Sequence, residues 1–384
     1  MALSDLAIFD PDRVRSDPDQ SDHDERTFDF YDRCSNKVIG LVRDRLEFWF
    51  ARYPEGRDRN DLLGRFRSGD RRHWNSAFWE LYVHEALRRF GFDVVPHPAL
   101  NDVPTHIDFL ATRGMERVFV ECVTLGHADD DVARRNGVAA LQAALDKSGL
   151  HDYWLDLEID SYGPTPIPHG RFRRALVAWV GAQDIDVLAA LVPRGLFAIP
   201  AFEWHRNGWR IQVRAIPREP SLRGRTDMRP LGIMPADDEG DTPTWAAMRD
   251  LLRDKASKYG KLDAPFLIAL DAPDVWPNHR EATWAVYGPR PFTEAWERDG
   301  FLLRQDGRSY PRVSGVLVGT AIQPHSFPRC WPTLHENPAA ERRLPQALRW
   351  TRIRAGREES VDVPGIDPPE LFGVAPDWPG TPWP

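Results

Sequence analysis

Two carboxylates stand inside apolar, strand-like runs of the stretch 106–125, which reads HIDFLATRGMERVFVECVTL. Asp108 lies in the first run and Glu121 in the second. The β-branched and aromatic residues of both runs favour strands, and the Gly114-Met115 pair between them favours a two-residue turn. Counting outward from that turn places Asp108 opposite Glu121. In an antiparallel pair their side chains then share a face, with Cβ atoms roughly 5 Å apart.

Two like charges placed opposite each other on a largely apolar face are destabilising unless something compensates them. A divalent cation such as Mg²⁺ or Mn²⁺ is one compensation, because it prefers oxygen ligands and can activate a bound water. The structural alternative is a hairpin whose carboxylates reach arginines such as Arg117. The sequence therefore predicts a metal site at Asp108 and Glu121, with a purely structural pair as the alternative.

The elements that must position these acids can be expected from periodicity and punctuation. The helix at 75–90 is expected to be capped by Asn75 or Ser76 and ended by Gly91. The hairpin at 202–216 carries an Asn-Gly turn, and the strand at 265–271 is almost fully apolar. The other expected elements are helices at 37–53, 128–149, 172–191 (one helix or two) and 244–260, and strands at 92–98, 153–159 and 312–322.

These elements predict an α/β protein in three parts. Residues 1–73 form an N-terminal arm and helix, with an exposed or disordered stretch at 11–30 and a polar loop at 54–73. Residues 74–271 form the core, with an insertion at about 151–243 and a loop at 216–243. Residues 272–384 form a Pro- and Trp-rich extension packed on the core, whose tail at 361–384 wraps around it or is disordered.

The order helix, strand, Asp-bearing strand, Glu-bearing strand, helix resembles the core of the PD-(D/E)XK nuclease superfamily. The resemblance covers about residues 74–150 and resumes at 244–271. It implies a restriction-endonuclease-like fold, a mixed sheet flanked by helices, with large insertions. Asp108, in THID rather than PD, and Glu121 match the motif's acids and would bind Mg²⁺ or Mn²⁺. The resemblance adds Glu80 and the backbone carbonyl of Cys122 as ligands; the Cys122 side chain is expected in the core.

The motif's lysine position is occupied by Val123, which cannot donate a proton or steady a negative charge. The resemblance allows this lysine to move to a helix, and three of the five lysines fall in the window 255–261. Lys255 lies on the apolar stripe formed with Met248, Leu252 and Tyr259, whereas Lys258 and Lys261 lie off it. Lys255 is therefore the predicted catalytic amine, with a snorkelling surface lysine as the alternative. Tyr259 is expected to be a core residue.

Other side chains near the hairpin could also do chemistry. A histidine metal site would need an i,i+4 pair on one helix, which is not formed by His84, His97, His106 and His127. Scattered core or surface histidines are therefore favoured. His106 would share a face with Asp108 and could orient this ligand without binding the metal itself. The arginines of 57–74 and 171–176 could contact phosphates, although a solvated charged surface is the favoured interpretation.

Composition sets the class of protein. The chain has 384 residues, 42% hydrophobic content and a net charge of −8, as expected of a soluble globular protein. Cys34, Cys122 and Cys330 match no zinc or disulfide spacing, which indicates a reducing cytoplasm. The sequence shows neither a signal-peptide core nor an apolar run of about 20 residues, so no membrane segment is expected.

The resemblance implies a Mg²⁺-dependent endonuclease that hydrolyses phosphodiester bonds of nucleic acid, with DNA favoured, in bacterial defence or DNA processing. A homodimer or a partner protein is compatible with it. The alternative is a catalytically inactive nuclease-like scaffold that binds nucleic acid or a protein partner, with Val123 marking lost chemistry. A small-molecule enzyme that uses the carboxylates as general acid and base is a third hypothesis.

Overall fold

The computed structural model describes residues 6–99, 107–126, 129–231, 244–260, 262–273, 275, 279–289, 299–303, 310–355 and 360–381, with the backbone alone at 129–135 and 360. The predictions for His106, His127 and Lys261 lie outside the described residues. The chain forms two compact units. One comprises residues 1–20, 26–126 and 239–384, and the other comprises residues 21–25 and 127–238.

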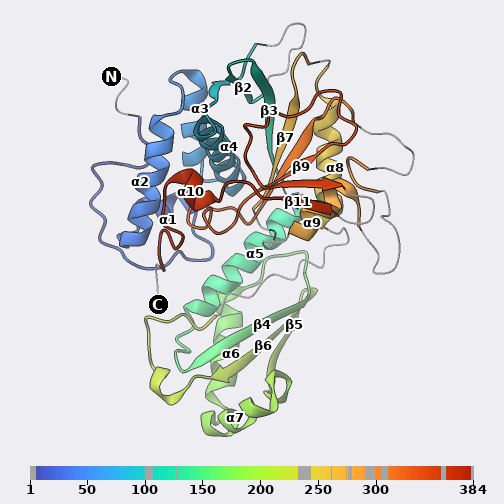
Figure 1. Cartoon of the computed structure of the whole chain (residues 1–384). Helices are drawn as coiled ribbons and strands as arrows, with labels where there is room; N and C mark the ends of the chain where they lie inside the picture. The colour runs from blue at the N-terminus through green and yellow to red at the C-terminus, as the bar shows by residue number, and fades with distance from the viewer. Residues whose placement is uncertain are drawn as a thin grey trace. The chain divides into compact units, whose positions relative to one another are not determined.

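The first unit is built on an eight-stranded mixed sheet in the order β1-β2-β3-β7-β8-β9-β10-β11 (Figure 1). Its strands are parallel at β3–β7, β7–β8 and β9–β10 and antiparallel at the other junctions. The strands are β1 (Asp93–Pro96), β2 (Phe109–Arg113), β3 (Glu116–Thr124), β7 (Phe266–Ala272), β8 (Gly315–Thr320), β9 (Thr333–Glu336), β10 (Arg352–Ala355) and β11 (Ser360–Val363). This arrangement confirms the predicted α/β class.

The β2–β3 hairpin has the predicted register. Leu110 pairs with Phe119 and Thr112 pairs with Arg117, across a turn in which Gly114 adopts a φ of 58°. That left-handed conformation is open to glycine at no steric cost, so the turn residue determines the pairing. Strand β7 is buried along its whole length, as its apolar sequence predicts.

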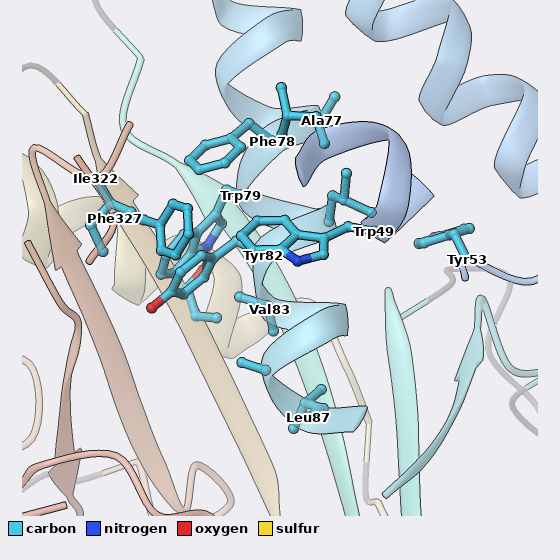
Figure 2. Packing of buried hydrophobic residues seen from close by; sticks show 14 of the residues in the cluster. Trp49, Tyr53, Ala77, Phe78, Trp79, Tyr82, Val83, Leu87, Ile322 and Phe327 are labelled. Carbon is cyan, nitrogen blue, oxygen red and sulfur yellow. Dashed lines mark hydrogen bonds between the residues drawn. The ribbon is translucent and has the colours of Figure 1, made fainter. Parts of the chain in front are cut away.

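One face of the sheet is covered by α4 (Arg71–Arg89), whose residues from Trp74 to Leu87 are buried with few exceptions. Trp79 stacks on Tyr82 with ring centroids 5.5 Å apart (Figure 2). The indole N–H of Trp79 donates to the carbonyl of Ala269 at 2.9 Å. The helix begins earlier than predicted, because Asp70 caps it through the backbone N–H of Arg72 at 2.8 Å. The prediction of Asn75 or Ser76 as the cap was wrong.

Further helices pack around α4: α1 (Thr27–Arg33), α2 (Lys37–Ala51), α3 (Arg57–Arg67) and α10 (Pro368–Phe372). The predicted loop at 54–73 was wrong, because α3 buries Leu62, Leu63 and Phe66 between its arginines. Part of the predicted N-terminal arm is helical in α1. Its buried Asp32 pairs with Arg13 at 2.5 Å and with Arg15 at 3.0 Å, which ties the preceding segment to the unit.

The opposite face of the sheet is covered by α8 (Thr244–Ser257) and α9 (His279–Tyr287). Residues after 314 supply four of the eight strands, β8 to β11, and thus complete the sheet. The sequence predicted a single strand there and an extension packed on a finished core. The short β9, β10 and β11 carry too few residues for a visible period, and β8 anchors them by pairing with β7.

The second unit contains a three-stranded antiparallel sheet, β4-β6-β5, with its own hydrophobic core (Figure 1). The expected insertion begins at about 151, whereas this unit already includes α5. The predicted turn is present, with positive φ at Asn207 and Gly208. The elements are α5 (Asp129–Asp146), β4 (Tyr153–Ser161), α6 (His169–Gly181), α7 (Ile185–Leu191), β5 (Ala201–Arg206), β6 (Trp209–Pro217) and short 3-10 helices at Val192–Arg194, Leu196–Ala198 and Pro220–Leu222.

In the part of the chain that the structure describes, no individual helix has the length and apolar character to cross a membrane. By length and composition alone, the bent pair His169–Gly181 and Ile185–Arg194, with 86° between its halves, meets that test.

Candidate metal centre

Asp108 lies at the entry of β2, directly before its first paired residue. Its Oδ2 accepts a hydrogen bond of 2.6 Å from the backbone N–H of Cys122, and its own carbonyl accepts one of 2.8 Å from the N–H of His97. The first bond ties the Asp108 carboxylate to the strand that carries Glu121. The paired register of β2 and β3 ends at Phe109 and Val120, one residue short of the predicted pairing of Asp108 with Glu121.

Glu121 is buried on β3, with 4% of its side chain exposed. Its Oε1 lies 3.2 Å from the Lys255 ammonium and 3.7 Å from the Lys258 ammonium. Its Oε2 accepts a hydrogen bond of 2.5 Å from the Tyr259 hydroxyl. A buried carboxylate surrounded by three donors is compensated by the chain itself, which explains how it is tolerated inside a strand.

The stripe on α8 delivers Lys255, and Lys258 and Tyr259 follow directly after the end of this helix. Met248 and Leu252 are fully buried, and Lys255 follows them on the same side of the helix. The structure thus brings the predicted Lys255 to the predicted Glu121. The contacts of Lys258 and Tyr259 were missed. The signal for Tyr259 was available, because a tyrosine in a core carries a hydroxyl that needs a partner.

Glu80 faces α2 and α3 from the buried side of α4. Its Oε1 accepts a hydrogen bond of 2.7 Å from the Tyr53 hydroxyl, and its Oε2 accepts one of 2.5 Å from the Arg65 guanidinium. Both partners come from outside the segment that carries the resemblance. The buried Glu80 therefore forms an ion pair with the partly exposed Arg65, which the sequence did not predict.

The three acids share one electrostatic environment. The pKa of Glu121 is raised mainly because burial disfavours the charged form, and the charge of Asp108 raises it further, against Tyr259 and the two lysines. Burial also raises the pKa of Glu80; the Arg65 guanidinium opposes this, and the Asp108 charge again adds to it. Asp108 therefore stands close enough to both glutamates to disfavour their ionisation.

His97 lies against Asp108, a contact that was not predicted from the sequence. Its Nε2 is 3.7 Å from Oδ1 of Asp108, and its Nδ1 is 3.2 Å from Oδ1 of Asp58. The Asp108 contact is the main cause that raises the pKa of His97 to about 9. This position follows from the pairing of β1 with β2, in which Pro96 pairs with Phe109 and the backbone N–H of His97 donates to the carbonyl of Asp108.

His84 is a core histidine, in agreement with the favoured interpretation. Its ring lies between Tyr53 and Phe109, with ring centroids 4.7 Å and 5.8 Å away, and no part of it is exposed. Burial lowers the pKa of His84 to about 3, so the imidazole is neutral in the folded protein.

Several arginines proposed as phosphate contacts are occupied within the chain. Arg59 is buried over the ring of Phe50, Arg65 binds Glu80, and Arg67 donates to the carbonyls of Ala7 and Ile8. Each of these three side chains has a partner within the chain, which a phosphate contact would have to replace. Arg171 and Arg174 in α6 are exposed.

The donor set suits a hard divalent cation in its chemistry. Carboxylate oxygens and the Cys122 backbone carbonyl are the ligands that Mg²⁺ and Mn²⁺ prefer. Within the described ranges, no three or more His, Cys, Asp or Glu side chains are gathered closely enough to hold a metal ion. Binding a cation would require these acids to give up some of their present contacts. Those contacts are made by Lys255, Lys258, Tyr259, Arg65, Tyr53, His97 and the Cys122 N–H.

Comparison with protein-family models, with curated proteins and with solved structures finds no match to this chain.

Proposed function

We propose that this chain is a Mg²⁺- or Mn²⁺-dependent nuclease with a restriction-endonuclease-like core. One observation carries the proposal: an amine from α8 reaches the buried glutamate of β3, and the aspartate that directly precedes β2 is bonded to the same strand. The Asp, the Glu and an amine are the three groups that the resemblance requires. The core elements also run in the expected order, with α4 followed by β1, β2 and β3, and α8 followed by β7 at the side of β3.

Each residue has a role in this proposal. Asp108 and Glu121 hold the cation, with the Cys122 carbonyl beside them. Glu80 joins them only if it gives up its hydrogen bond to Arg65 or to Tyr53 for a bond to the cation. The cation supplies an activated water and offsets negative charge on the phosphate. Lys255 orients that water or steadies the anion that develops, in place of the amine that Val123 cannot supply.

Cleavage of plasmid DNA in Mg²⁺ or Mn²⁺ tests the proposal. The wild-type protein should nick or linearise the plasmid, and Asp108→Asn and Glu121→Gln should abolish this. Glu116→Gln is a matched control, because Glu116 is a partly exposed acid of the same hairpin that pairs with Arg113. Cleavage that persists equally in Asp108→Asn and Glu121→Gln contradicts the proposal. DNA as the substrate, bacterial defence as the setting and a homodimer or protein partner rest on the resemblance alone.

The inactive scaffold remains a second proposal, supported by a specific observation. Asp108, Glu121 and Glu80 each have donors supplied by the chain itself, so the described fold is electrostatically satisfied as it stands. Calorimetric titration with Mg²⁺ separates the two proposals. Heat of binding that disappears in Asp108→Asn supports the nuclease. A folded wild-type protein that binds no Mg²⁺ supports the scaffold.

A further inference from the structure

Two ammonium groups converge on one oxygen of Glu121. Lys255 and Lys258 both approach Oε1, at 3.2 Å and 3.7 Å, while the Tyr259 hydroxyl occupies Oε2. One carboxylate carries one negative charge, so the second ammonium is in excess at this oxygen. Lysine is suited to such a double role, because its compact ammonium on a flexible stem can exchange one oxygen partner for another.

The two lysines differ in depth. Lys255 has 21% of its side chain exposed and makes the hydrogen bond to Glu121, whereas Lys258 has 40% exposed. Lys258 also lies over the ring of Tyr259, with its Nζ 5.4 Å from the centroid. The outer amine is therefore the more weakly held of the two and the nearer to solvent.

The acids and bases around Asp108 and Glu121 are equal in number. Arg65, His97, Lys255 and Lys258 stand against the acids Glu80, Asp108, Glu121 and Asp58. A divalent cation bound at Asp108 and Glu121 would add two positive charges to this balanced group. Like charges repel strongly where solvent is partly excluded, so one amine should leave. We expect this to be Lys258, because it is the more exposed of the two lysines.

We infer that Lys258 is a phosphate-binding residue, held on Glu121 in the metal-free protein and transferred to the nucleic-acid backbone when a divalent cation binds. This inference rests on the proposed function. It makes Lys258 a competitor of the cation in the absence of nucleic acid and a ligand of the phosphate in its presence. Metal and nucleic acid should therefore bind cooperatively, since a phosphate accepts the amine that the metal displaces.

The test uses Lys258→Met, with Lys147→Met as the matched control, because Lys147 is an exposed lysine paired with Asp22. Calorimetry with Mg²⁺ alone should show several-fold tighter binding for Lys258→Met than for the wild type. Fluorescence anisotropy with a short DNA duplex in Ca²⁺ should show several-fold weaker binding. Its salt dependence should lose about one unit of slope, the value for one phosphate contact. In EDTA, Lys258→Met and the wild type should bind the duplex equally.

Lys258→Arg keeps the charge and should retain the salt slope, which separates a lost phosphate contact from a folding defect. Equal Mg²⁺ affinity and an unchanged salt slope in Lys258→Met overturn the inference and leave the proposed nuclease intact. The same loss of duplex affinity with and without divalent cation also overturns it, since the transfer would then be absent. A wild-type protein that binds no Mg²⁺ overturns the proposed function and the inference together.

Discussion

The ammonium of Lys255 lies 3.2 Å from Oε1 of Glu121, although 134 residues separate the two in the chain. Two features create this contact. Strand β7 pairs in parallel with β3, and α8, which leads into β7, packs on the same face of the sheet as Glu121. An amine that the local sequence ECV cannot supply therefore arrives from another element.

Replacing Lys255 tests whether this amine is catalytic. Lys255→Met should lower the cleavage rate by about 10²–10³-fold, the usual cost of removing one preorganised donor to a developing charge. Lys255→Arg should show a similarly low cleavage rate, because a planar guanidinium does not replace a compact ammonium at this position. Single-turnover kinetics on plasmid DNA measure the effect.

The control for Lys255 lies on the same helix. Arg253 pairs with Asp250 and Asp299 instead of reaching the site, so Arg253→Met should retain the wild-type rate. Equal losses in Arg253→Met and Lys255→Met would show that the effect is a general disturbance of α8.

The Arg65–Glu80 pair predicts a large stability effect. Arg65→Met leaves the buried Glu80 carboxylate with Tyr53 alone and should cost about 3–5 kcal/mol, as breaking a buried ion pair does. The double variant Arg65→Met/Glu80→Met should recover most of this loss, because it leaves no uncompensated charge. Urea unfolding of the three proteins gives the comparison. Additive losses in the double variant would contradict the ion-pair explanation.

His84 predicts acid sensitivity with a defined sign. Its folded pKa of about 3 lies below the ordinary value of 6.5, so the unfolded chain takes up a proton that the folded protein refuses. Its contribution to stability is complete above pH 6.5 and declines as the pH falls, by up to about 1.4 kcal/mol per pH unit.

His84→Leu removes this titration and should flatten the pH dependence of stability. The measurement is the free energy of unfolding in urea at about pH 7.5 and about pH 5. His325 and His335, whose pKa values burial also lowers, to about 4 and about 3, remain in both proteins and cancel in the comparison. Parallel loss of stability in the wild type and His84→Leu would contradict the prediction.

Gly319 on β8 predicts a steric effect at the junction with α4. A Cβ there would lie 2.7 Å from Cδ1 of Ile322 and 3.0 Å from the Trp79 ring, which its hydrogen bond to Ala269 holds in place. Gly319→Ala should therefore destabilise the protein by about 1–3 kcal/mol. Gly181→Ala at the end of α6 is the control, since a Cβ there meets nothing within 4 Å. The melting temperature should fall only for Gly319→Ala.

The sequence by itself determined the features that neighbouring residues control. The Gly114-Met115 turn sets the hairpin register, since only one pairing closes it. The stripe through Met248, Leu252 and Lys255 sets the face of α8, since helical periodicity is local. From these two facts the approach of Asp108 to the strand of Glu121 and the choice of Lys255 could be predicted.

Tertiary structure alone decided the rest. The Tyr53 and Arg65 contacts of Glu80, the position of His97 and the short strands β9 to β11 depend on segments far apart in sequence. None of them leaves a periodic pattern in the sequence. A four-residue strand or a single ion pair is stabilised by neighbours that only the packing of distant segments brings to it. The elements around the acids follow from local patterns, and the partners that compensate their charge follow from the way the sheet is assembled.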